Sequence, residues 1–159
     1  MRMIAACLLA LGSFAAAAAT PAPAPQAGVA TGPAQVRIVQ VDDAWRMTVN
    51  GQPYYVRGAG SAEGDLEQLA ARGGNSFRTW STGTDVAKVR AMLDRAQRNG
   101  LTVAMGLAVG KERHGFDYDD PAAVAAQLER LRAEVRLYRD QPAVLMWLVG
   151  NELNLEARN

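Results

Sequence analysis

The stretch Val144-Leu145-Met146-Trp147-Leu148-Val149-Gly150-Asn151-Glu152 decides the predicted fold. Its unbroken apolar run predicts a strand buried on both faces, as strands are in parallel sheets covered by helices. Gly150 ends the run, and Asn151 and Glu152 place an amide and a carboxylate just beyond it. In barrels, the carboxyl ends of the strands form the edge where reacting groups gather. The stretch therefore predicts a parallel sheet with a polar site at that edge.

Upstream of this stretch the chain repeats a unit of strand, loop and helix. The predicted strands are residues 56–61, 75–80 and 101–109, and residues 65–72 form a short predicted helix closed by Gly73-Gly74. Such alternation is typical of an α/β protein with a parallel sheet.

Two longer helices are predicted between these strands. Thr84 is the candidate N-cap of the first, which ends at Gly100, and Asp120-Pro121 begins the second. Each helix carries an apolar stripe that we expect to be buried. The stripes are Val86, Val89, Leu93 and Ala96 in the first helix, and Val124, Leu128, Leu131 and Val135 in the second.

Two architectures fit this pattern: an open doubly wound sheet and a closed eight-stranded barrel. A doubly wound nucleotide binder should carry a glycine-rich turn after its first strand. Gly58-Ala59-Gly60-Ser61-Ala62-Glu63 has two of the three glycines, but Glu63 occupies the third position. Asp65 and Glu67 then follow where a pyrophosphate would lie, so we interpret the match as chance.

Three segments precede the repeat. Residues 1–19 combine a positive start, a short apolar stretch and an alanine run, which predicts a signal peptide and a secreted or periplasmic protein. Residues 20–34 form a Pro/Ala-rich linker. Residues 35–56 form a β-hairpin region turned at Asn50-Gly51, with a third short strand expected at residues 54–56. We expect this region to be a lid or a lead-in to the domain of residues 57–159.

Composition excludes several classes of function. The net charge of +1 over 159 residues, with no basic run, gives no basis for binding nucleic acid or an anionic membrane. The one cysteine, Cys7, lies in the expected signal peptide, so no thiolate zinc site or disulfide framework is expected. The one histidine cannot build a multi-histidine metal site. We therefore expect no metal, no organic cofactor and no membrane anchor after signal cleavage.

Four blocks in a fixed order resemble the clan A glycoside hydrolases, and within them the barrel domain of family 2. The blocks are Val49-Asn50-Gly51-Gln52-Pro53-Tyr54, Val56-Arg57-Gly58, Asn75-Ser76-Phe77-Arg78, and residues 147–152. The resemblance implies a (β/α)8 TIM barrel preceded by the hairpin region. It also implies retaining hydrolysis of O-glycosidic bonds in an oligo- or polysaccharide, without a cofactor.

The resemblance also implies roles for three residues. Glu152 matches the general acid/base, Asn151 the amide that binds the sugar 2-hydroxyl, and Arg78 the arginine that holds the nucleophilic carboxylate ionised. Enclosure by Trp147 and other apolar groups would raise the pKa of such an acid toward neutrality. The plainer interpretations are a solvated glutamate after a strand for Glu152 and a surface ion pair for Arg78.

Three further residues are candidate substrate contacts: Trp80, His114 and Trp147. Trp80 is either a core residue or a platform on which a sugar stacks. His114 lies in a polar loop after the third strand, where it either contacts substrate or is simply solvated.

The chain departs from the family pattern in two ways. Thr79-Trp80-Ser81 stands where family members often have a histidine, and the chain reaches about four strands whereas such a barrel takes about 250 residues. The nucleophile expected after the seventh strand has no match, since Glu63, Glu112 and Asp117 do not fit its position. We therefore expect a fragment that supplies the acid/base half of the site. A transglycosylase of the same clan and a non-catalytic carbohydrate-binding protein on a degenerate barrel are the alternatives.

Overall fold

The structure, a computed structural model, describes residues 32–61 and 64–157. The expected signal peptide, most of the linker and Glu63 lie outside these residues. Within the described ranges, no helix combines the length and the apolar character needed to cross a membrane.

The first sheet is antiparallel and has the order β1-β2-β3, with β1 at Val36–Val41, β2 at Ala44–Val49 and β3 at Gln52–Pro53. The Asn50-Gly51 turn is confirmed, and both residues have the positive φ, 51° and 78°, that a tight hairpin turn needs. The third strand was predicted at residues 54–56, which is wrong. The Tyr54 amide still donates to the Met47 carbonyl of β2 at 2.9 Å, and its hydroxyl bonds the Asn75 carbonyl (2.7 Å) and the Thr102 hydroxyl (2.8 Å).

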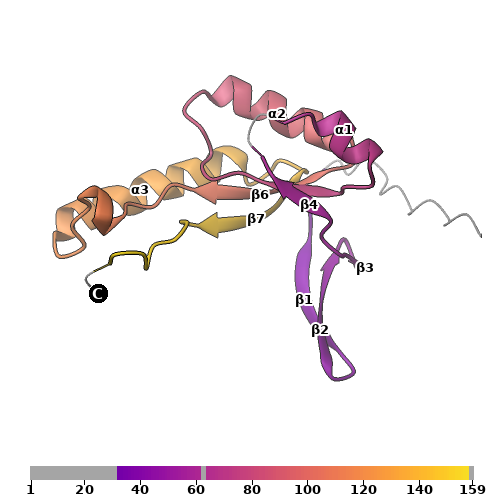
Figure 1. Cartoon of the computed structure of the whole chain (residues 1–159), viewed down its shortest axis with the longest axis horizontal. Helices are drawn as coiled ribbons and strands as arrows, with labels where there is room; N and C mark the ends of the chain where they lie inside the picture. The colour runs from indigo at the N-terminus through magenta and orange to yellow at the C-terminus, as the bar shows by residue number, and fades with distance from the viewer. Residues whose placement is uncertain (1–31, 62–63, 158–159) are drawn as a thin grey trace, which may run out of the picture.

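This docking places the hairpin region at the amino ends of the parallel strands. Asn75 precedes β5 and Thr102 begins β6, and burial raises the pKa of the Tyr54 phenol that contacts both. Arg57 Nε also donates to the Gly73 carbonyl at 2.9 Å. The hairpin then projects away from the rest of the molecule (Figure 1). It therefore lies at the edge opposite the predicted site and does not cover that site.

The second sheet is parallel and runs in the order β4-β5-β6-β7. Its strands are β4 (Gly58–Gly60), β5 (Ser76–Arg78), β6 (Thr102–Leu107) and β7 (Val144–Val149). Each successive strand lies beside the one before it, so the described strands contain no point at which the order reverses. A doubly wound sheet needs such a reversal.

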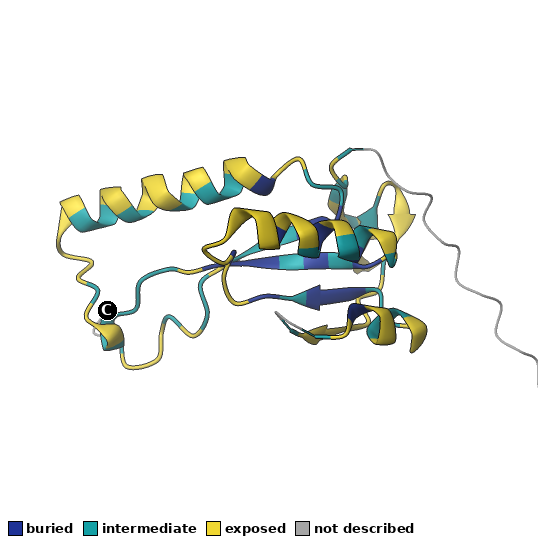
Figure 2. Ribbon diagram, turned by 90° about the horizontal axis from the view of Figure 1, so that it is seen from above, coloured by how far each residue is buried: buried dark blue, intermediate teal, exposed yellow. Residues whose placement is uncertain are grey.

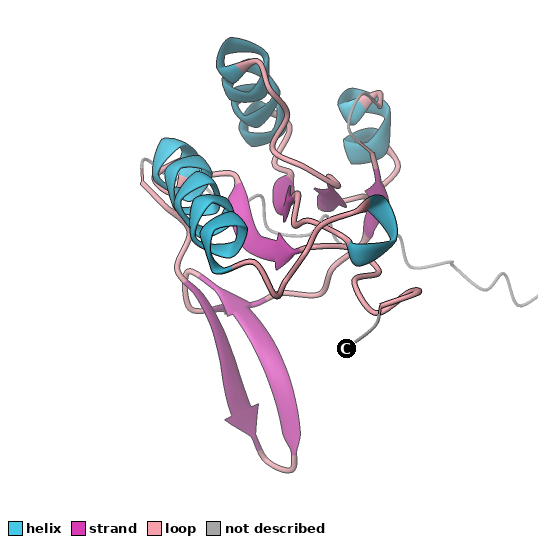
Figure 3. Ribbon diagram, turned by 90° about the vertical axis from the view of Figure 1, so that its left-hand side faces the viewer, coloured by secondary structure: helices cyan, strands magenta, loops and turns pink. Residues whose placement is uncertain are grey.

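Three α-helices connect the parallel strands: α1 (Leu66–Ala71), α2 (Val86–Arg98) and α3 (Pro121–Tyr138). Because crossovers between adjacent parallel strands share one hand, a sequential strand order places the helices on one side of the sheet. Figure 3 shows this arrangement, with the three helices on the same side of the strands. A short 3-10 helix, η1 (Glu112–His114), follows β6.

The core lies between the sheet and α1 and α2. On α2, the predicted stripe residues Val89, Leu93 and Ala96 are buried against strand residues such as Val103 and Met105. The predicted cap is wrong by one residue, because the Asp85 carboxylate accepts from the amides of residues 87 and 88 (3.0 and 3.1 Å). Val86 is consequently the first helical residue and is 40% exposed.

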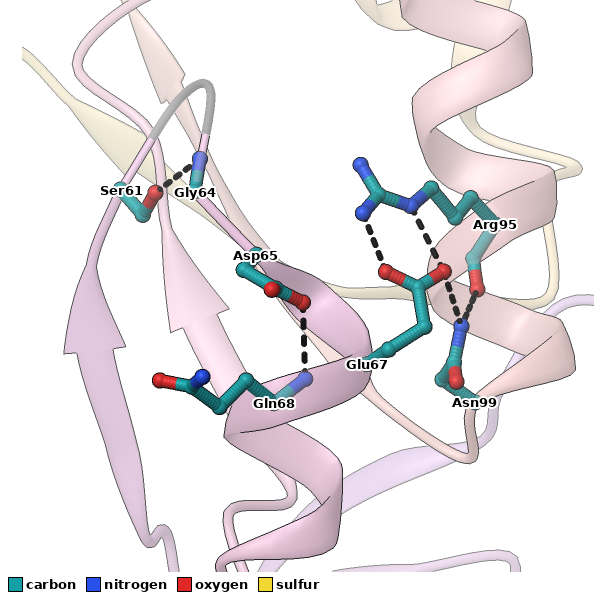
Figure 4. A network of polar contacts seen from close by, with 7 residues as sticks. All are labelled: Ser61, Gly64, Asp65, Glu67, Gln68, Arg95 and Asn99. Atoms are coloured by element: carbon teal, nitrogen blue, oxygen red, sulfur yellow. Dashed lines mark hydrogen bonds and ion pairs between the residues drawn. The ribbon is translucent and has the colours of Figure 1, made fainter.

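A side-chain clamp at the surface joins α1 to α2 (Figure 4). Arg95 Nε donates to Glu67 Oε1 at 2.8 Å, its Nη2 donates to Glu67 Oε2, and Asn99 Nδ2 donates to Glu67 Oε1 at 3.2 Å. The hydrogen bonds from Arg95 are the main reason that the pKa of Glu67 falls from 4.5 to about 2.

Helix α3 begins as predicted but does not bury its stripe. Asp120 caps it and Pro121 is its first residue. Leu128 is 45% exposed, and the other stripe residues are only half-buried. The helix has 18 residues and the strands beneath it six at most, so it extends beyond the sheet, as Figure 2 shows. Only its last residue, Tyr138, reaches the core.

Candidate active site

One hydrogen bond connects the carboxyl ends of two parallel strands. Arg78, the last residue of β5, donates from Nη2 to Oδ1 of Asn151, two residues beyond β7, at 3.1 Å. These residues are 73 apart in sequence, and β6 lies between their strands. Two residues predicted for the site are thus brought into contact across three strands.

Two glycines allow the chain after β5 to lie close over the sheet. A Cβ at Gly106 would approach the Trp80 carbonyl carbon to 2.4 Å, and the Gly106 amide donates to the Thr79 hydroxyl at 3.0 Å. A Cβ at Gly60 would lie 3.0 Å from the Trp80 ring. Trp80 therefore lies close to Gly60 through its ring and to Gly106 through its backbone. Any residue larger than glycine at position 106 would clash with that backbone.

Arg78 and Trp80 form a stacked pair. The Arg78 guanidinium carbon lies 5.2 Å from the centre of the Trp80 ring, within the range of a cation–π contact, and Trp80 is 50% exposed. Arg78 Nε is buried and has no hydrogen-bond partner among the described residues. The guanidinium therefore retains a donor beyond its bond to Asn151.

A cleft of about 510 Å³ opens beside this pair. Three predicted residues, Trp80, His114 and Asn151, line it, together with the loop that follows β6. The lining residues from that loop and from the end of β6 are Leu107, Ala108, Val109, Gly110, Lys111, Gly115 and Phe116.

Glu152 lies next to the cleft, but its carboxylate does not line it. The residue has a left-handed φ of 53°, and its side chain is 63% exposed. Arg113 Nη1 donates to the Glu152 carbonyl at 2.6 Å and to the Leu155 carbonyl at 3.3 Å, and its Nη2 lies 3.4 Å from the carboxylate. Arg113 thus bonds the backbone of this segment at two carbonyls and contacts the Glu152 carboxylate.

Sequence reasoning missed Arg113, which is only 13% exposed in its side chain. A signal for it was present: it stands in the loop Lys111-Glu112-Arg113-His114 after a predicted strand, at the same edge as Glu152. A long cationic side chain there can reach the carbonyls of a neighbouring strand-end loop. Its partner could not be read from the sequence.

Trp147 lies apart from the other candidates. It is paired with Met105 on the sheet and packs against the hydrophobic core on the helix side. The predicted enclosure of Glu152 by Trp147 is therefore wrong, because the carboxylate is exposed and contacts Arg113 instead. Within residues 32–61 and 64–157, no group of three or more His, Cys, Asp or Glu side chains could hold a metal ion.

The comparisons with known proteins include a distant structural neighbour. No family model and no curated protein sequence matches the chain. Among solved structures, an exo-chitosanase from Amycolatopsis orientalis aligns with 18% identity and a TM-score of 0.46. The alignment covers 72% of this chain and 15% of that one, so this chain spans a small part of the neighbour's length. At this TM-score the likeness is weak and carries no weight for the chemistry of this chain.

Proposed function

We propose that the chain supplies the acid/base half of a retaining O-glycoside hydrolase, secreted or periplasmic, in which β4 to β7 are the first strands of a (β/α)8 barrel. The observation that carries the proposal is the Arg78–Asn151 hydrogen bond at the carboxyl edge of the sheet, beside a cleft with an exposed tryptophan. Sites of this architecture lie at that edge. Trp80 and His114 are the proposed substrate contacts.

The bond from Arg78 also supports the proposed role of Asn151. Because Oδ1 of the amide accepts from Arg78, its Nδ2 remains as the donor for a sugar 2-hydroxyl. The Arg78 guanidinium is the proposed partner of a second carboxylate, the nucleophile that retention requires about 5–5.5 Å from the acid.

Glu152 is the proposed acid/base. In the first step it protonates the glycosidic oxygen while the nucleophile attacks the anomeric carbon, and in the second it deprotonates the water that releases the sugar. Its carboxylate must turn from Arg113 toward the cleft to do this. The exposure of the side chain leaves room for that rotation.

The experiment is Glu152→Gln, made in the protein together with any coding sequence that follows Asn159 in its gene. Glu156→Gln is the matched control, because Glu156 is exposed, lies in the same segment and has a similar φ of 55°. We expect Glu152→Gln to lower hydrolysis of alkyl glycosides by about 10²–10⁴-fold and that of aryl glycosides with good leaving groups less in the first step. Equal losses on both substrates, or an equal effect of Glu156→Gln, would contradict the role of Glu152.

A non-catalytic carbohydrate-binding protein is the second candidate function. The observation in its favour is that, among the described residues, no acidic side chain lines the cleft, and the Glu152 carboxylate is held by Arg113. This candidate would be favoured if the parent protein and the Glu152→Gln variant both bind saccharides and neither gives a cleavage or transfer product. Products lengthened by a sugar acceptor would instead indicate a transglycosylase.

A further inference from the structure

The ionisable side chains that line the cleft, Lys111 and His114, are both basic. Among the described residues, no Asp or Glu lines it. We propose that the cleft binds a sugar that carries an anionic substituent, a carboxylate or a sulfate. This rests on the proposed function only in that the ligand is a carbohydrate.

The surroundings of the cleft add one further cation. The Arg78 guanidinium stacks on the lining residue Trp80, 5.2 Å from the centre of its ring. The Glu152 carboxylate, the acidic group closest in sequence to the lining residue Asn151, is already paired with Arg113. Glu112 and Asp117 belong to the same loop, but neither lines the cleft and both have partners.

The remaining lining residues suit the body of a sugar. Trp80 and Phe116 offer aromatic faces for the apolar side of a pyranose ring, and Asn151 offers an amide for a hydroxyl. The Lys111 ammonium provides three donors, and the His114 ring provides a donor in either protonation state. A ligand ammonium in this cleft would meet the like charge of the Lys111 ammonium, so an amino sugar is disfavoured.

The experiment measures binding in the Glu152→Gln protein, so that no ligand is turned over. The probes are a methyl hexuronide, the matched neutral methyl hexoside, its 6-sulfate and the 2-amino sugar, titrated by calorimetry or by amide shifts in NMR spectra. We expect the hexuronide or the sulfate to bind about tenfold more tightly than the neutral sugar, the gain expected from one charge-assisted hydrogen bond. Which of these two anionic sugars binds more tightly shows whether the cleft prefers a carboxylate or a sulfate.

Two variants tie the preference to the cleft. Lys111→Gln and His114→Asn should each reduce the anionic preference, whereas Lys88→Gln, which removes an exposed charge at the start of α2, should leave it unchanged. Unaltered amide shifts outside the cleft show that a variant is folded. Sodium sulfate alone is the control for simple anion binding.

The outcomes separate this proposal from the proposed function. Neutral, anionic and amino sugars binding equally well would overturn the anionic preference while leaving carbohydrate binding intact. Binding of none of the sugars would overturn both. Sulfate ion competing as strongly as the sulfated sugar, or a preference that Lys111→Gln and His114→Asn leave unchanged, would also overturn the preference.

Discussion

At the scale of single residues, the segment after β7 depends on one cation. Glu152 adopts a left-handed φ of 53°, a backbone conformation that costs a residue other than glycine roughly 1–3 kcal/mol unless its surroundings hold it. Arg113 bonds the carbonyls of Glu152 and Leu155, in addition to the backbone hydrogen bond from the Leu155 amide to the Glu152 carbonyl (3.4 Å). We therefore regard Arg113 as a positioning residue for the proposed acid.

Replacing Arg113 tests this role. In Arg113→Met we expect kcat on alkyl glycosides to fall about 10–100-fold with little change in KM, because the acid is misplaced while the cleft is intact. Arg113→Lys, which keeps the charge, should recover part of the loss. Arg132→Met, which removes an exposed pair with Glu129, is the control and should leave kcat unchanged. A rise in KM with an unchanged kcat would contradict the positioning role.

At the scale of elements, the α1–α2 clamp makes stability depend on pH. The pKa of Glu67 lies at about 2 in the folded protein, below its ordinary value of 4.5, so the folded state favours the ionised carboxylate. The clamp therefore stabilises the folded state fully above pH 4.5, and this stabilisation is lost as the pH falls from 4.5 to about 2.

Glu67→Gln should remove this contribution. We expect the variant to unfold at a lower urea concentration than the parent at pH 7. The difference should shrink as the pH is lowered toward 2, because the carboxylate of the parent then becomes progressively protonated. Urea unfolding at several pH values measures it. Glu129→Gln, on an exposed i,i+3 pair, is the control, and an equal effect there would count against the clamp.

The order of the elements was predictable from the sequence, but the faces they present were not. Helix ends and strands carry local signals, such as Asp120-Pro121 and the apolar run of β7, and these were confirmed. The side on which Trp147 lies depends on a shift of one residue in the β6–β7 register, between Val103 and Ala104. Without that shift Trp147 would be paired with Gly106 on the opposite face. No pattern in the sequence marks it.

For the candidate site, the sequence predicted which strand ends come together but not the contacts made by the loops. Arg78 ends β5 and Asn151 follows β7, so their meeting at one edge follows from the parallel sheet alone. The pairing of Arg113 with Glu152 depends on the path of an irregular loop and therefore required coordinates.

At the scale of the whole molecule, the core is one-sided. It fills the space between the sheet and α1 and α2, whereas much of α3 faces outward (Figure 2). Leu93 is 1% exposed and Leu128 is 45% exposed, although both lie in the apolar stripe of a helix. The two leucines therefore differ in what their removal should cost.

The same truncation at the two positions measures this difference. We expect Leu93→Ala to lower the free energy of unfolding by about 2–5 kcal/mol, the cost of a cavity in a packed core. Leu128→Ala should cost less than about 1 kcal/mol, because its side chain is already half in water. Urea denaturation followed by circular dichroism gives both values. Similar losses at the two positions would mean that α3 is covered in solution.

The hairpin region and the cleft lie at opposite edges of the parallel sheet. It is fastened through Tyr54 at the amino ends of the strands, and its tip at Asp42-Asp43 lies at the far end of a ribbon that points away from the parallel sheet (Figure 1). A protein immobilised, tagged or fused through that tip would present the cleft to solution unobstructed. The same turn is a place where a further domain could be inserted without changing any residue at the carboxyl edge of the parallel sheet.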